Sequence, residues 1–142
     1  MKLLLYGGTF DPPHQGHINN LTAAIRAVQP DRVVVMPAGV PPHKQASTTP
    51  GSVRLAMCQC FLPLHPQLTV SSWELGRQGK NYTIDTVEML QTAYPGADLY
   101  LQQELQLCCL HSRKHKDCRG NRGRKDNSSF KGRNKGNSCS PR

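Results

Sequence analysis

The fold of this chain is decided by the stretch Gly7-Gly8-Thr9-Phe10-Asp11-Pro12-Pro13-His14-Gln15-Gly16-His17, residues 7–17, which joins a short apolar run to a helical pattern. The run before it, Leu3-Leu4-Leu5-Tyr6, is typical of a buried strand. Glycines in the turn let the main chain approach a ligand closely, and the helix N-terminus that follows attracts phosphate. His14 and His17 lie three residues apart, so one helix face carries both imidazoles. The stretch therefore predicts a site that binds phosphate.

Apolar runs alternate with helical patterns over residues 1–101, which favours βαβ units around a parallel sheet. The predicted fold class is α/β, with a doubly wound, Rossmann-like parallel sheet whose ligand crevice lies at the carboxyl ends of the strands. Residues 7–17 and Pro37–Lys44 both fall at such ends, and the loop 37–51 is expected to lie over the site. We expect strands at 3–6, 32–36, 68–70 and 98–101. The first expected helix follows the glycine turn and ends before Pro30. A second runs from Ser52 as N-cap to about Leu62, and a third from Thr83 as N-cap to about Tyr94.

Three ordered blocks carry a family resemblance. His14-Gln15-Gly16-His17 within residues 7–17 resembles the signature of the HxGH nucleotidyltransferases. Pro37-Ala38-Gly39-Val40-Pro41-Pro42-His43-Lys44 is similar to the PxxxPPHK segment of one branch, the nicotinate-nucleotide adenylyltransferases. The third block, from Trp73-Glu74-Leu75 to Asn81-Tyr82-Thr83-Ile84-Asp85-Thr86, resembles a further segment of that branch. The resemblance covers residues 1–101 and stops there.

The resemblance implies adenylyl transfer from ATP to nicotinate mononucleotide, giving nicotinic acid adenine dinucleotide and pyrophosphate in NAD biosynthesis. Mg²⁺ would accompany ATP, with no protein ligand assigned to it. The implied catalytic residues are His14, His17 and Lys44. Those implied for ATP binding are Gly7, Gly8, Thr9, Phe10, His14, Gly16 and His17, and those for the acceptor nucleotide are Gly8, Tyr82 and Thr83.

Structural roles are the alternatives for several of these residues. The two histidines could simply cap the helix, and Lys44 could end a solvated loop. Tyr82 could be a core tyrosine beside an N-cap at Thr83, whereas ligand contact is favoured because helix N-termini suit carboxylates. Asp11 is predicted to be a turn residue rather than a metal ligand. Trp73 and Glu74 are predicted to be structural, and Arg54 is predicted to pair with a carboxylate at a helix surface.

Charge divides the chain into two parts. Residues 1–101 carry 7 Lys and Arg against 6 Asp and Glu, whereas residues 102–142 carry 11 against 3. We therefore expect the N-terminal part of a nucleotidyltransferase domain at 1–101 and a basic, disordered tail at 102–142, in which 102–110 could extend a helix. Gln102-Gln103-Glu104 stands where the family has Gly-Ser/Thr-Asp, and no later Ser-Ser/Thr-x-Ile-Arg segment follows. This departure is interpreted as a truncated or frame-shifted end, or as a genuinely divergent tail.

The departure leaves two rival functions open: a catalytically inactive nucleotide-binding fragment, and a basic nucleic-acid-binding protein. The second is disfavoured because the segment 119–125 has no interleaved aromatic residues on which bases could stack. Cys109, His111, His115 and Cys118 match no common zinc spacing. The first residues lack a secretory pattern and no apolar run could cross a bilayer, so we expect a cytoplasmic protein with free thiols and no membrane partner.

Overall fold

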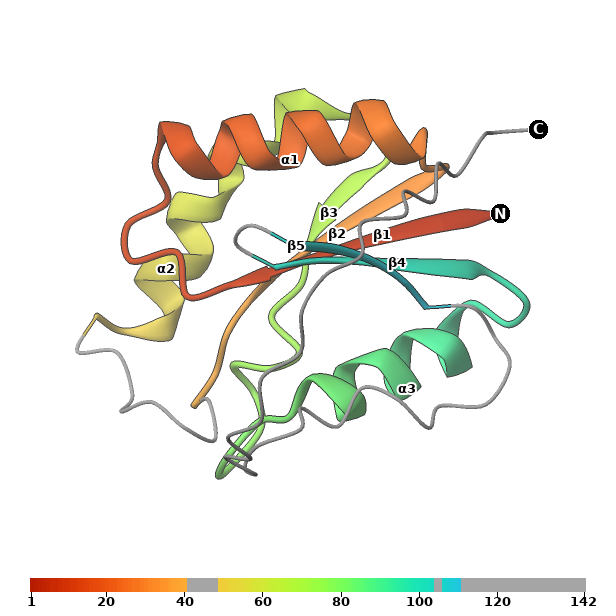
Figure 1. Ribbon diagram of the computed structural model, residues 1–142. Helices are drawn as coiled ribbons and strands as arrows, with labels where there is room; N and C mark the ends of the chain where they lie inside the picture. Colours follow the sequence, from red (N-terminus) through yellow and green to blue (C-terminus); the bar gives the residue numbers. More distant parts are fainter. Residues whose placement is uncertain (41–48, 104–105, 111–142) are drawn as a thin grey trace, which may run out of the picture.

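A mostly parallel sheet in the strand order β3-β2-β1-β4-β5 forms the centre of the computed structural model, which describes residues 1–40, 49–103 and 106–110 (Figure 1). β1 lies in the middle and pairs in parallel with both β2 and β4. β3 extends the parallel sheet beyond β2, and β5 closes the other edge as an antiparallel neighbour of β4. The strands are β1 Lys2–Gly8, β2 Arg32–Pro37, β3 Leu68–Val70, β4 Asp98–Gln103 and β5 Gln106–Leu110.

The sheet is doubly wound, as predicted. The chain moves outward from β1 to β3 and then returns past β1 to β4, so the strand order reverses between β1 and β4. Ligands of such sheets bind beyond the carboxyl ends of the strands at this reversal. The carboxyl ends of β1 and β4 are therefore placed where a ligand would lie.

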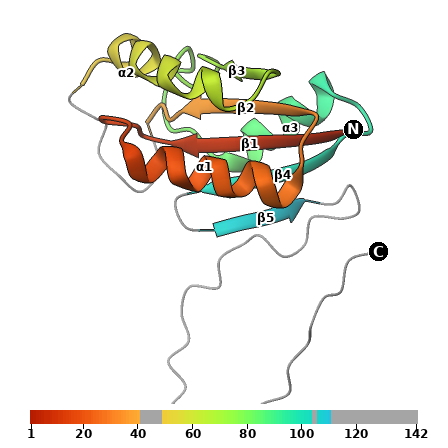
Figure 2. The same ribbon diagram turned by 90° about the horizontal axis from the view of Figure 1, so that it is seen from above.

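Helices cover both faces of the sheet. α1 (Gln15–Val28) and α2 (Gly51–Met57), which leads into a 3-10 helix η1 (Cys58–Leu64), lie on one face, and α3 (Thr83–Ala93) lies on the other (Figure 1). Seen from above, α1 lies on the β1–β4 side of the sheet and α2 on the β2–β3 side (Figure 2). None of the helices in the described part of the chain is both long and apolar enough to span a membrane.

Two hydrophobic clusters hold the helices to the sheet, and β1 contributes to both by alternation. Leu4 and Tyr6 pack on the α1 face, while Leu3 and Leu5 pack on the α3 face. A strand covered on both faces must be apolar throughout, which is why residues 3–6 form an uninterrupted apolar run. The α1-face cluster also contains Phe10, Leu21, Ala24, Val33, Val35, Cys58, Phe61 and Leu68, and the α3-face cluster also contains Val34, Met36, Val87, Leu90, Leu99 and Leu110.

The helix expected from Ser52 to about Leu62 differs from the observed one in both its cap and its form. α2 begins at Gly51 after Pro50, and the N-cap makes no side-chain hydrogen bond, so Ser52 is not the cap. The α-helix ends at Met57, and the chain continues in 3-10 geometry through Pro63. Proline lacks the N–H that an α-helical hydrogen bond requires, which favours the shorter, tighter turns near this position.

Sheet pairing continues past the boundary expected at Leu101. β4 runs on to Gln103, and β5 returns antiparallel to it with Tyr100 opposite Cys109. The expected helical extension over 102–110 is therefore wrong. Leu110 is buried in the α3-face cluster and β5 occupies the open edge of β4, so tertiary pairing outweighs a weak local preference here. The tail from residue 111 onward lies outside the described residues.

Candidate active site

The turn after β1 brings the glycine pair to the carboxyl end of the central strand. Gly8 ends β1 opposite Pro37 of β2, and its carbonyl accepts a 2.8 Å hydrogen bond from the Ala38 N–H. A Cβ built on Gly7 would meet no heavy atom within 4 Å. The main chain at Gly7 therefore faces open space, and a ligand can approach it there without displacing a side chain.

The side chain of Phe10, which lies in the turn after β1, is buried in the core. Its φ of 51° turns its ring into the core, where the ring is 1% exposed. Ring centroids lie 5.3 Å from Tyr6, 5.2 Å from Phe61 and 5.1 Å from His17, all in edge-to-face geometry. The side chain of Phe10 thus packs in the core against the His17 ring, and its contact with ATP stays a prediction.

His14 and His17 cap α1 reciprocally. His14 is the N-cap residue, and its Nδ1 accepts a 3.0 Å hydrogen bond from the Gly16 N–H. The Nδ1 of His17 accepts a 3.1 Å bond from the His14 N–H. The two rings lie close together, with centroids 3.9 Å apart. This is a capping box in which imidazoles take the places usually filled by Ser and Glu.

The capping bonds also fix the tautomer of both rings. A neutral imidazole carries one proton, and a nitrogen that accepts a backbone hydrogen bond is the unprotonated one. Nδ1 is the acceptor in both rings, so Nε2 carries the proton in both. Capping and phosphate binding are thus compatible: Nδ1 satisfies the helix and Nε2–H is a donor suited to a phosphate oxygen.

Gly16 is required by the His14 ring. A Cβ at position 16 would lie 2.8 Å from Cε1 and 2.9 Å from Nδ1 of His14. Real Cβ atoms do not approach other heavy atoms so closely, so any side chain here would move the ring. The glycine of the HxGH element therefore keeps the first imidazole in place.

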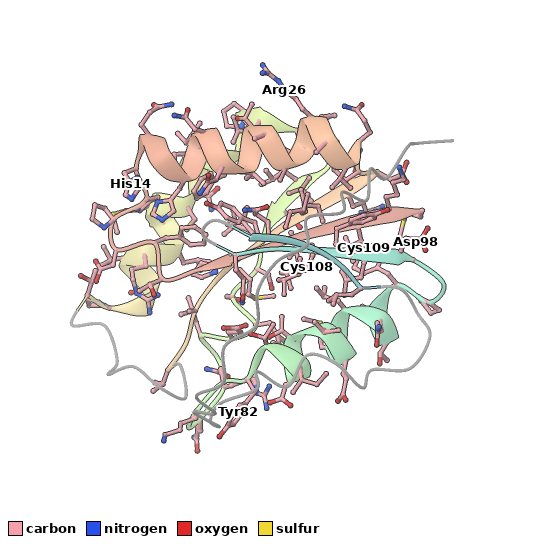
Figure 3. The ribbon with its side chains drawn as sticks, viewed as in Figure 1. His14, Arg26, Tyr82, Asp98, Cys108 and Cys109 are labelled. Atoms are coloured by element: carbon pink, nitrogen blue, oxygen red, sulfur yellow. The ribbon has the colours of Figure 1, made fainter. Side chains whose placement is uncertain are left out.

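The N-terminus of α3 lies at the same end of the sheet but on the opposite face. Figure 3 shows His14 at the start of α1 and Tyr82 at the start of α3. Tyr82 is the N-cap residue and is 48% exposed, so neither a core role for Tyr82 nor the expected N-cap at Thr83 is correct. Thr83 is the first helical residue, and its Oγ1 accepts a 3.3 Å bond from Gln103 Nε2. The start of α3 is thus exposed beside the end of β4.

Glu74 links the segment after β2 to α3. Its Oε2 accepts a 3.4 Å bond from the Gly39 N–H, and its Oε1 accepts a 2.6 Å bond from the Thr86 hydroxyl. The neighbouring Asn81 donates its backbone N–H to Val40 O at 2.7 Å. The predicted structural role of Glu74 is confirmed. The Trp73 ring packs against the Arg77 guanidinium, 4.7 Å from the ring centroid, and Arg77 pairs with Asp85.

Arg54 departs from its predicted role. It does not pair with a carboxylate at a helix surface: it is 4% exposed, and the part of the chain that the structure describes places no carboxylate within ion-pair distance of it. Nη1 donates to Thr9 O at 3.0 Å and to Ala38 O at 2.8 Å, and Nε donates to Thr49 O at 3.3 Å. This role could not be predicted from the sequence, because every residue has a backbone carbonyl and the acceptors of Arg54 are therefore not marked by their residue type.

Other predicted residues fall elsewhere. Lys44 and His43, like His111, His115 and Cys118 of the unusual Cys/His spacing, lie outside the described residues. Asp11 lies exposed in the turn. Within the described ranges, no three His, Cys, Asp or Glu side chains are grouped so as to hold a metal ion.

The thiol and hydroxyl groups with shifted pKa values lie on η1 and β4, outside the glycine turn and the helix starts. Cys58, Cys60, Cys108 and Cys109 are free thiols. Burial raises the pKa of the Cys58 thiol to about 12, and burial also raises the pKa of Cys60. Burial, with a smaller effect of the facing Cys109, raises the pKa of the Tyr100 hydroxyl. A thiol held neutral in this way is inert, so Cys58 acts as an apolar core residue.

A family model and curated relatives match the chain. The cytidylyltransferase-like family model matches residues 5–122. A protein of Acidithiobacillus ferrooxidans named "Probable nicotinate-nucleotide adenylyltransferase" is 41% identical over 97 residues, 68% of this chain and 44% of that protein. Proteins with the same name are similar in Shouchella clausii (43% over 100 residues, 70% of this chain and 52% of the relative) and in Neisseria meningitidis serogroup C (38% over 99 residues, 70% and 50%). The chain spans about half the length of these relatives.

Proposed function

The chain belongs to the cytidylyltransferase-like family, and we propose that it transfers the adenylyl group of ATP to nicotinate mononucleotide, releasing pyrophosphate. One observation carries the proposal: Nδ1 of both imidazoles accepts a backbone hydrogen bond at the start of α1, which leaves Nε2–H as the donor of each ring, beside a glycine turn with open space at Gly7. Paired Nε2–H donors at a helix N-terminus suit a polyphosphate. The names of the relatives support the choice of acceptor.

The chemistry requires no nucleophile from the protein. A 5′-phosphate oxygen of the mononucleotide attacks the α-phosphorus of ATP in line; the new P–O bond forms as the bond to the β-phosphate oxygen breaks, and pyrophosphate leaves. Catalysis is then positioning plus stabilisation of the charge that develops on the phosphates. His14 and His17 supply donors fixed before the substrate arrives, which is where such stabilisation is most effective. Mg²⁺ enters as part of the MgATP substrate.

The start of α3 is proposed to bind the pyridine carboxylate. The exposed N-cap at Tyr82 and the first helical residue, Thr83, present backbone N–H groups at the same end of the sheet as His14. Helix N-termini favour anions, so a carboxylate is preferred to a neutral carboxamide. In this proposal the two nucleotides approach from opposite faces and meet beyond the end of β1.

Pyrophosphate release tests the proposal when it is measured with three acceptors: nicotinate mononucleotide, nicotinamide mononucleotide and phosphopantetheine. We expect the nicotinate nucleotide to be preferred. Preference for either other acceptor would refute the substrate assignment, and absence of release with all three, in a folded chain that still binds ATP, would favour a second candidate.

That second candidate is a chain that binds nucleotide without transferring it, and one contact favours it. Gln103 donates to the Thr83 hydroxyl beside the proposed acceptor site, and it stands where the resemblance leads us to expect a smaller Ser or Thr. Replacing Gln103 with Gly distinguishes the two candidates. Acceptor binding that appears only in Gln103→Gly would support the inactive chain.

A further inference from the structure

Arg54 is a buried cation at the meeting point of three segments. Its side chain is 4% exposed and projects from α2. A single nitrogen, Nη1, donates both to Thr9 O in the turn after β1 and to Ala38 O after β2, at 3.0 and 2.8 Å. Nε donates to Thr49 O, just before α2, at 3.3 Å. The guanidinium therefore fastens the proposed ATP loop directly to the segment that follows β2.

The segment Ala38–Val40 is held from its other side as well. The Gly39 N–H donates to Glu74 Oε2, and the Thr86 hydroxyl donates to Glu74 Oε1. Val40 O accepts the N–H of Asn81, the residue before the α3 N-cap. A continuous set of contacts thus runs from the turn after β1, through Arg54 and Ala38–Val40, to the start of α3.

Space around this segment is tight, so it cannot shift alone. A Cβ built on Gly39 would contact the Asn81 amide nitrogen and lie 2.6 Å from Glu74 O. Close packing of this kind transmits a displacement and does not absorb it. Movement of the ATP loop would therefore be felt at the start of α3, both through Arg54, which joins Thr9 to Ala38, and through the 2.8 Å hydrogen bond between the Ala38 N–H and Gly8 O.

We infer that Arg54 is a positioning residue that couples the two substrate half-sites, so that binding of either nucleotide raises the affinity for the other. The ligand that binds first pays the conformational entropy of ordering the joined segments, so the second ligand binds more tightly. This is positive cooperativity, and it is the same in either order of binding. The identity of the two ligands rests on the proposed function. The link between the segments does not, and it can be tested without turnover.

Coupling is measured as the ratio of dissociation constants for α,β-methylene ATP, which cannot transfer its adenylyl group, without and with saturating nicotinate mononucleotide. We expect a ratio of about 5–150 in the parent chain, the usual range of such couplings. Arg54→Lys keeps the charge but has a shorter side chain and lacks the Nε donor that binds Thr49 O, and Arg54→Met keeps only the bulk. Both should lower the ratio clearly below the parent value, because only the Gly8–Ala38 hydrogen bond then joins the loop to the segment after β2. The control is Arg26→Met, an exposed position on α1 labelled in Figure 3, which should keep the parent ratio.

Hydrogen exchange supplies a measurement that needs only inorganic pyrophosphate. In the parent chain, pyrophosphate should slow exchange of the Ala38 and Gly39 amides as well as those of residues 7–10. In Arg54→Lys the protection of Ala38 and Gly39 should be smaller than in the parent chain, while that of residues 7–10 is kept. If Arg54 had only a structural role, its replacement would raise the amide exchange rates of the whole chain, and residues 7–10 and 38–39 would change by similar amounts.

Two results would overturn the inference: folded Arg54 variants that keep the parent ratio, or protection confined to residues 7–10 in the parent chain. The second result decides the matter even if the variants do not fold. If pyrophosphate protects both segments but nicotinate mononucleotide does not bind, the link stands and the proposed acceptor is wrong.

Discussion

Replacing His17 with Ala separates the capping role that the structure shows for this residue from the phosphate role proposed for it. The substitution removes the Nδ1 acceptor of the His14 N–H, at 3.1 Å, and the ring contact with Phe10, at 5.1 Å between centroids. Loss of a cap costs about 0.5–2 kcal/mol, and loss of an aromatic edge contact costs about 0.5–1.5 kcal/mol. We therefore expect His17→Ala to be less stable by about 1–3.5 kcal/mol while still folding.

Turnover should fall much further. The Nε2–H of His17 is proposed to stabilise charge that grows in the transition state, and loss of one such donor lowers kcat by about 10²–10³-fold. Because the donor acts mainly in the transition state, KM for ATP should change less than kcat. Pyrophosphate release measures the rate, and denaturant unfolding followed by circular dichroism measures the stability.

His65 supplies a matched control. Its Nδ1 accepts the Gln67 N–H at 3.1 Å, the same length as the His17 bond, and its Nε2 pairs with Pro30 O at 3.1 Å. His65→Ala should thus lose a similar amount of stability, about 1–3 kcal/mol by the same reasoning, yet keep its turnover. Equal losses of kcat in the two variants would mean that the effect of His17 is only structural, and the phosphate assignment would be wrong.

Three further outcomes are expected. Gly16→Ala should lower kcat without unfolding the chain, because its Cβ would displace the His14 ring; the measurement is the kcat of the folded variant. Gly7→Ala should leave the unfolding midpoint unchanged and weaken ATP binding in calorimetry, because its Cβ enters the open space left for the ligand. The free energy of unfolding should fall as the pH rises from about 9 toward about 12, because the Cys58 thiol ionises near 9.0 in the unfolded chain but not in the folded one. Thermal melts at these pH values should show a smaller fall in Tm for Cys58→Ala than for the parent chain.

The central fold could be predicted because its signals are local. An uninterrupted apolar run marks a strand covered on both faces, and the period of Ile18, Leu21, Ile25 and Val28 marks the inner face of α1. β5 could not be predicted in this way. Its pairing depends on the free edge of β4 and on burial of Leu110, neither of which is visible in five residues of sequence.

The site was predictable where side chains carry the chemistry and unpredictable where they act on the main chain. The His14 and His17 pair is apparent from its spacing; its capping role is confirmed, and the proposed phosphate role is compatible with capping because it uses the other ring nitrogen. Arg54 and Glu74 bind main-chain groups from segments far away in sequence. Backbone acceptors and donors are the same at every residue, so such links emerge only from the fold.

Nitrogen NMR of the imidazole rings tests the proposed phosphate site most directly. In ¹⁵N-labelled chain, the structure predicts Nε2 protonated and Nδ1 unprotonated in His14, His17 and also His65, which has the same pattern of bonds. Addition of inorganic pyrophosphate should then shift the Nε2 signals of His14 and His17 and leave those of His65 in place. Protonated Nδ1 in the capping pair, or pyrophosphate shifts that spare both rings, would contradict the assignment of this helix start as the polyphosphate site.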